Sequence, residues 1–167
     1  MKNSQNVKLF AFSSVLLAIS IILSYIENLL PSNNLLFGVR IGLSNICVVL
    51  GISIIGKMRT FIITILRVIL MSLIFGSIIK FYISIFGFFL SFLCMCLYSN
   101  VKNYDIIVLS IIGGFSHILG QFIALIILLN NTNVLYILPM YLLLGIITGL
   151  FIGILSKLIL KKLKYIL

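Results

Sequence analysis

Long apolar runs separated by short polar segments dominate the hydropathy pattern of this chain. A helix needs about 20 mainly apolar residues to cross the hydrocarbon core of a bilayer. Six stretches approach that length, and we expect membrane-spanning helices over Val7–Leu30, Leu36–Gly56, Thr60–Ile79, Phe81–Ser99, Asp105–Leu129 and Val134–Leu160. None of the runs alternates between polar and apolar residues as the strands of a membrane barrel do. The pattern therefore predicts one all-α integral membrane domain over residues 1–167.

The composition supports this prediction and excludes a soluble enzyme. Of the 167 residues, 63% are hydrophobic and 8% are charged, whereas soluble domains contain roughly a quarter charged residues. Glu27 and Asp105 are the two acidic residues, which leaves little material for an acid–base or metal site, so we expect no metal and no cofactor. Cys47, Cys94 and Cys96 fall within the apolar runs, lack metal-ligand spacing, and are expected to pack as small hydrophobic residues.

The net charge of +10 reflects topology rather than nucleic-acid binding, because the basic residues lie between apolar runs. The polar linkers include Pro31–Asn34, Lys57–Arg59 and Asn130–Asn133. If the N-terminus is inside, nine basic residues fall on the cytoplasmic side: Lys2, Lys8, Lys57, Arg59, Lys102, Lys157, Lys161, Lys162 and Lys164. Lys80 falls outside, and Arg40 and Arg67 lie within the membrane. The positive-inside rule therefore predicts that both termini are cytoplasmic.

Polar side chains within the apolar runs are candidates for a binding site, because each is costly to bury in lipid. The candidate substrate-binding residues are Glu27, Asn28, Arg40, Asn45, Arg67, His117 and Gln121. Arg40 is expected to begin the second helix close to Glu27, and His117 and Gln121 share one helical face. We expect the set to converge on an outward-opening cavity. Two arginines against one glutamate favour an anionic substrate, whereas the alternative is that these residues only bridge helices.

Small residues indicate two packing surfaces. Gly145, Gly149 and Gly153 recur at every fourth position, which is typical of close helix–helix packing. Ser14 and Ala18, together with Ala11, are expected to present a flat surface to a partner subunit.

The segment from Gly51 to Lys57 matches the first seven positions of a P-loop, but Met58 replaces the Ser or Thr that binds magnesium. Any ATP-driven process would therefore require another protein.

Three stretches, Glu27–Pro31, Gly38–Asn45 and Gly113–Gln121, resemble the heptaprenyl diphosphate synthase component I family, which is also called the Gx transporter family. Arg67 and Leu138-Pro139 fit the resemblance, which covers nearly the whole chain. The family usually carries lysine where Arg40 stands, which keeps the charge. It usually carries asparagine where Ile118 stands, so a polar group is lost there.

The resemblance implies two different functions. The family name implies a subunit of a trans-prenyltransferase, but those enzymes hold magnesium with paired aspartate-rich motifs, which this chain lacks, so we expect a non-catalytic accessory subunit at most. The size and six-helix layout look instead like the substrate-binding S components of energy-coupling-factor transporters. Those proteins lie in the bacterial plasma membrane, capture a small solute, and dock on a transmembrane partner and two ATPase subunits. By that likeness, Ala11, Ser14 and Ala18 would contact the partner. A third alternative is a membrane scaffold whose polar contacts are satisfied internally.

Overall fold

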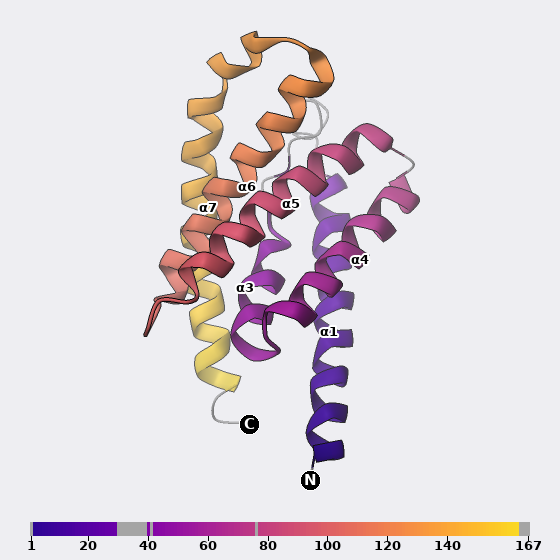
Figure 1. Ribbon diagram of the computed structural model, residues 1–167, viewed down its shortest axis with the longest axis vertical. Coiled ribbons are helices and arrows are strands. Elements are labelled where there is room, and N and C mark those ends of the chain that lie inside the picture. Colours follow the sequence, from indigo (N-terminus) through magenta and orange to yellow (C-terminus); the bar gives the residue numbers. More distant parts are fainter. Residues whose placement is uncertain (1, 30–39, 41, 76, 164–167) are drawn as a thin grey trace.

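The computed structural model describes residues 2–29, 40, 42–75 and 77–163, with side chains from residue 6 onward. The described residues form six α-helices and one short 3-10 helix. In chain order these are α1 (Lys2–Leu29), α3 (Asn45–Ile54), α4 (Lys57–Phe75), α5 (Ile78–Tyr98), α6 (Ile106–Leu129), η1 (Thr132–Tyr136) and α7 (Leu138–Leu163). The start of α1 and the end of α7 lie at the same end of the molecule (Figure 1).

Five helices, α1, α4, α5, α6 and α7, are long and apolar enough to cross a membrane. Outward-facing apolar side chains such as Phe10, Leu73 and Ile127 are 64% to 75% exposed, as expected for a surface in contact with lipid rather than water. The chain is therefore an all-helical, multi-pass membrane protein.

The second apolar run differs from the expected continuous helix over Leu36–Gly56. Residues 36–39 lie outside the described residues, and the helical part, α3, has only 10 residues. The expectation that Arg40 begins this helix is wrong, because Arg40 and Gly42–Ser44 are not helical. Gly42 and Gly56 bracket α3 with φ angles of +92° and +88°, a conformation that glycine adopts without the steric cost of a side chain. These two glycines limit the length of α3.

The predicted linker Lys57–Arg59 is the first turn of α4 rather than a loop. Ile55 and Gly56 make the turn, because their N–H groups both donate to the Gly51 carbonyl, at 2.9 Å and 3.1 Å, and close α3. The Lys57 ammonium group then donates to the Cys96 carbonyl at 3.1 Å and to Asn100 Oδ1 at 2.5 Å. Lys57 therefore joins the start of α4 to the end of α5.

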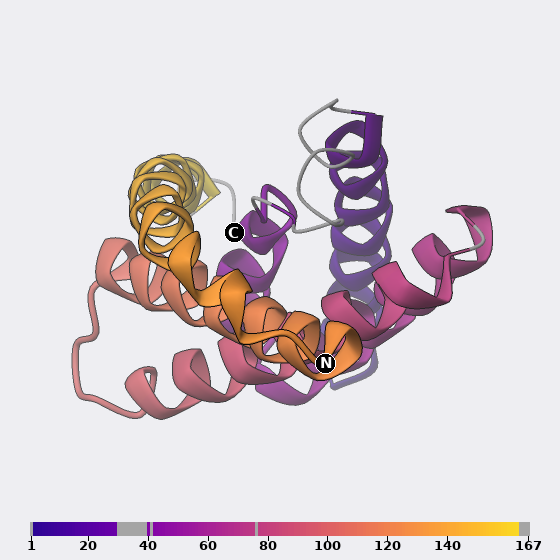
Figure 2. The same ribbon diagram turned by 90° about the horizontal axis from the view of Figure 1, so that it is seen from above.

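Helix α6 forms the centre of the bundle. In its most apolar window 56% of the residues are buried, against 17% for α1, so α6 is central and α1 is peripheral. Helices α5 and α7 pack along α6, and α3 contacts α1, α4, α6 and α7. Viewed from above, α3 lies between α1 and α7 (Figure 2).

Glycines allow α6 and α7 to approach closely. A Cβ atom placed on Gly114 of α6 would lie 2.3 Å from the Gly145 carbonyl oxygen. On α7, Gly149 and Gly153 lie against the α6 backbone, where an added Cβ would come within 2.9 Å and 2.8 Å of the Cα atoms of Ile111 and Ile107. The glycine ridge of α7 therefore lies in a helix–helix interface within this chain.

Asp105, the second acidic residue, has a structural position at the start of α6. Its carboxylate accepts a hydrogen bond from the Ile107 N–H at 2.6 Å, which caps the helix, and it pairs with the Lys157 ammonium at 3.1 Å. Both interactions favour the charged carboxylate and hold the pKa of Asp105 below its usual value. Asp105 therefore links the ends of α6 and α7 and lies outside the buried polar cluster described next.

Candidate functional site

The non-helical backbone at Arg40 and Gly42 is fixed by side chains from distant helices. The Arg40 N–H donates to Gln121 Oε1 at 2.8 Å, and Gln121 Nε2 donates to the Arg40 carbonyl at 3.3 Å. The Gly42 N–H donates to the Glu27 carboxylate. Non-helical backbone at membrane depth is tolerated where protein groups satisfy its hydrogen bonds. Glu27 and Gln121 therefore supply to this segment the partners that a helix would otherwise provide.

His117 extends the same network, with its Nε2 2.6 Å from Gln121 Nε2. Because Gln121 Oε1 faces the Arg40 N–H, the other end of the amide must be the NH₂ group, which is a donor. His117 Nε2 therefore accepts, and the hydrogen-bond pattern assigns a neutral imidazole with its proton on Nδ1. Gln121 is 0% and His117 4% exposed, so both are buried beside the Arg40 segment. Gln121 anchors that segment, and contact of either residue with a substrate stays a prediction.

The side chain of Arg40 reaches back to α1. Its Nη2 atom donates to Asn28 Oδ1 at 3.3 Å, and Asn28 Nδ2 in turn donates to the Ser24 carbonyl at 2.8 Å. The carboxylate of Glu27 interacts electrostatically with both Arg40 and Arg67. The sequence-based expectation that Glu27 and Arg40 lie near each other agrees with this geometry.

Arg67 and Asn45 complete the cluster from α4 and α3. Arg67 is 4% exposed, and its charge acts on Glu27, Arg40, Cys47 and His117. Asn45 Nδ2 and His117 Cδ2 lie 2.9 Å and 3.4 Å from the position of a Cβ on Gly42. The structure therefore brings all seven sequence-predicted site residues together around one short segment.

Two glycines and a cysteine of this cluster were missed by the sequence reasoning. Gly42 makes room for Asn45 and His117. The Gly-Val-Arg-Ile-Gly pattern around Arg40 is the sequence feature that could have identified Gly42 as part of the site. Gly87 on α5 lets Gln121 and His117 approach, since a Cβ there would lie 2.7 Å from Gln121 Cγ. Cys47, which is 5% exposed, lies near Arg67. An isolated glycine or cysteine within an apolar run gives no sequence signal for such a contact.

The cluster contains buried hydrogen-bond donors that lack acceptors. Among its nitrogen atoms, Arg40 Nε, Asn45 Nδ2, Arg67 Nη1 and His117 Nδ1 have no hydrogen-bond partner within the described part of the chain. Each such buried group costs about 1–3 kcal/mol if it stays unsatisfied. With two arginines against one glutamate, the cluster also has an excess of positive charge. This arrangement is suited to the oxygen atoms of an anion. Among the described residues, no group of His, Cys, Asp and Glu could hold a metal ion.

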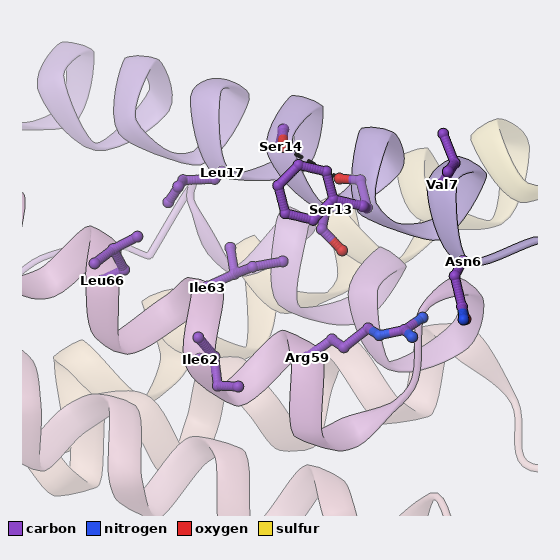
Figure 3. A pocket seen from close by; sticks show the side chains of 10 residues that line it. Asn6, Val7, Ser13, Ser14, Leu17, Arg59, Ile62, Ile63 and Leu66 are labelled. Carbon is purple, nitrogen blue, oxygen red and sulfur yellow. Dashed lines mark hydrogen bonds between the residues drawn. The ribbon is translucent and has the colours of Figure 1, made fainter. Parts of the chain in front are cut away.

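Four cavities that open on the surface are lined by residues outside this cluster. The largest of the four has a volume of about 830 Å³ and lies between α1 and α4 (Figure 3). Residues 30–39, which connect α1 to Arg40 and include Pro31 and Gly38 of the family-like stretches, lie outside the described residues. A cavity lined by Arg40, Arg67 and His117 stays a prediction.

The residues predicted to contact a partner lie on the exposed face of α1. Ala11, Ser14 and Ala18 are all exposed. The Ser14 hydroxyl donates to the Phe10 carbonyl of its own helix at 3.1 Å, so it adds little polarity to this face. The geometry leaves this face open to lipid or to another protein.

The fold and the buried polar cluster define a polytopic helical membrane protein with a donor-rich internal site. The chain belongs to the heptaprenyl diphosphate synthase component I family, whose model matches residues 16–159. The match includes all seven candidate site residues and Ala18, whereas Ala11 and Ser14 precede it. No curated protein and no solved structure matches the chain. The family name links the chain to a second synthase component and, with the apolar helices, to the membrane.

Proposed function

We propose that this chain is the solute-binding subunit of an uptake transporter in the bacterial plasma membrane. It captures an anionic or polar small molecule at the cluster around Arg40, and it depends on a transmembrane partner and two ATPase subunits for energy. The observation that carries the proposal is the set of buried donors that have no acceptor among the described residues: Arg40 Nε, Asn45 Nδ2, Arg67 Nη1 and His117 Nδ1. A chain that used these residues only to bridge helices would pair them.

A carboxylate or phosphate group on the solute would satisfy this site chemically. Such a group accepts several hydrogen bonds at once and neutralises the excess positive charge, and arginine's planar guanidinium group matches its geometry. Glu27 keeps the Arg40 segment in place, and Gln121 with His117 supports it from α6. With both termini in the cytoplasm, as the basic residues predict, the cluster lies in the outer half of the membrane, where a solute from outside would arrive.

The Arg67→Met variant is expected to lose the solute without losing stability. Arg67 Nη1 has no partner in the described protein, and removing this charge leaves one arginine opposite one glutamate. Because Glu27 still has Arg40 as a partner, no buried charge is left unpaired, and the large loss expected from breaking a buried ion pair does not apply. Binding of the anion is affected differently, because Arg67 is one partner of the buried charged pair that it would form with the solute. Losing one such partner costs about 2–5 kcal/mol of binding free energy, and the lower figure is about a thirtyfold loss of affinity.

The measurement is mass spectrometry of anionic small molecules released by denaturing equal amounts of purified wild-type and Arg67→Met protein. The matched control is Lys102→Met, which removes an exposed positive charge outside both the cluster and the cavity between α1 and α4. An anion present in the wild type and the control and lost from Arg67→Met supports the proposal. Equal retention by all three proteins, or no anion bound to the wild type from cells or from added extract, contradicts it.

A second candidate function is favoured by the family name: a non-catalytic membrane subunit of a heptaprenyl diphosphate synthase. The carboxylate of Asp105 caps a helix and pairs with Lys157, and the carboxylate of Glu27 accepts a hydrogen bond from the Gly42 N–H. Neither acidic residue is therefore placed to bind magnesium diphosphate. The basic end of α7, with Lys157, Lys161 and Lys162, is the candidate docking surface for a soluble synthase, although anionic lipid would bind it equally well.

Affinity purification from the native host in mild detergent separates the two candidates. Transport predicts that ATPase subunits copurify and that the variant Ala18→Trp, on the exposed face of α1 and outside the cavity between α1 and α4, reduces their yield. The accessory role predicts a soluble prenyl synthase whose yield falls when Lys161 and Lys162 are replaced by glutamine. Copurification of the synthase without ATPase subunits would overturn the transport proposal.

A further inference from the structure

The cavity between α1 and α4 has one polar end and apolar walls. Arg59, from the first turn of α4, points toward Asn6 near the start of α1 (Figure 3). Beyond this end, the walls are formed by Phe10 and Leu17 of α1 and by Ile62 and Leu66 of α4. Phe10 is 75% and Ile62 61% exposed, so the groove opens on the outer surface of the bundle rather than into its core.

The two serines that line the groove do not make its walls polar. Ser13 donates to the Leu9 carbonyl at 2.8 Å, and Ser14 donates to the Phe10 carbonyl at 3.1 Å. Both hydroxyl groups are thus paired with their own helix. The groove presents a hydrocarbon-like surface from Phe10 to Leu17 and from Ile62 to Leu66.

Among the described residues, no acidic side chain balances the charge of Arg59. Within the described residues, Arg59 takes part in no salt bridge, and the ion pair that is formed joins Asp105 to Lys157. The other acidic side chain, Glu27, is buried and holds Gly42. An anion from outside the chain is the natural counter-ion at this end of the groove.

We propose that this groove binds an anionic phospholipid, with the phosphate at Arg59 and one acyl chain between α1 and α4. The cavity of about 830 Å³ falls in the range of roughly 300–1,000 Å³ typical of small-molecule sites. The α1 wall from Asn6 to Leu17 is about 16 Å long at 1.5 Å per residue. A partner helix inserted into the groove itself fits less well, because it would bury the Arg59 charge without an acidic partner. Ala11 and Ala18 do not line the groove, so that part of the expected partner surface stays beside it.

The test is native mass spectrometry of the full chain in mild detergent with two lipid probes that share the same acyl chains, dioleoyl phosphatidylglycerol and dioleoyl phosphatidylcholine. The wild type is expected to retain the anionic lipid in preference. The variant Arg59→Gln should lower that preference about fivefold, which corresponds to the ~1 kcal/mol that one arginine contributes near an anionic surface. The control variant Lys102→Gln changes an exposed basic residue outside the groove, and it should leave the preference for the anionic lipid unchanged.

The apolar walls are tested by filling the groove. Ile62→Trp is expected to reduce the retention of both lipids, whereas Ile22→Trp, at an α1 residue that does not line the groove, should not. Circular dichroism confirms that each variant folds. The proposal is overturned if Arg59→Gln and Lys102→Gln lower the preference equally, if Ile62→Trp has no effect, or if farnesyl diphosphate displaces the phospholipid at equal concentration.

Discussion

The Glu27→Ala variant is expected to be less stable than the wild type by about 3–5 kcal/mol, the cost of removing one partner from a buried set of charges. Glu27 is 1% exposed and accepts a hydrogen bond from the Gly42 N–H. It also interacts electrostatically with Arg40 and Arg67. Without it, a backbone N–H and two buried cations lose their common partner, and the Arg40–Gly42 segment loses its link to α1.

This loss is measured by thermal melts in detergent, followed by far-ultraviolet circular dichroism because the chain contains no tryptophan. Asp105→Ala is the matched control, since it removes the other acidic side chain at an exposed helix cap and should cost only about 0.5–2 kcal/mol. Glu27→Gln keeps an oxygen that can accept from Gly42 and should fall between the two. Equal destabilisation by Glu27→Ala and Asp105→Ala would show that the buried carboxylate has no special role.

The second large effect is expected at the contact between α6 and α7. A Cβ on Gly114 would lie 2.3 Å from the Gly145 carbonyl oxygen, which belongs to backbone and cannot rotate away. Gly114→Ala must therefore push the two helices apart, and we expect a loss of about 1–3 kcal/mol, the usual cost of overpacking a core. Gly114→Val, with two further methyl groups, should prevent the native packing.

Gly113→Ala is the matched control, because it makes the same substitution one residue away. The nearest atom to a Cβ on Gly113 is Met95 Sδ at 2.7 Å, part of a flexible side chain that can change rotamer. We expect Gly113→Ala to be clearly more stable than Gly114→Ala in the same melts. The reverse order would mean that the close approach of Gly114 and Gly145 does not limit the packing of α6 on α7.

The hydropathy pattern predicted α1, α4, α5, α6 and α7 to within a few residues. Backbone that faces lipid must satisfy its own hydrogen bonds, so an apolar run of about 20 residues forms a helix almost regardless of what surrounds it. The same reasoning failed over Leu36–Gly56. There, Gly42 and Gly56 allow the chain to leave the helix, and Glu27 and Gln121 supply hydrogen bonds to Gly42 and Arg40 that no local pattern reveals.

The sequence also identified the polar residues of the candidate site, because buried polar side chains are rare in an apolar chain. It could not assign their tasks. Gln121 is 81 residues from Arg40 along the chain, yet it bonds both backbone groups of that residue. Gln121 therefore supports the Arg40 backbone, and the donors that lack acceptors among the described residues belong to Arg40, Asn45, Arg67 and His117. Which hydrogen bonds are already satisfied depends on distances between helices, which only folding sets.

The sequence by itself determined that this chain is a helical membrane protein, where most of its helices lie, and which polar residues the membrane must accommodate. Those properties follow from the free energy of placing each residue in lipid, which is local. The tertiary structure alone decided the break before α3, the role of each polar residue and the groove beside Arg59. Those features depend on contacts between helices that are distant in sequence. Small residues such as Gly42, Gly87 and Gly114 permit those contacts, but the sequence does not show which small residues do so.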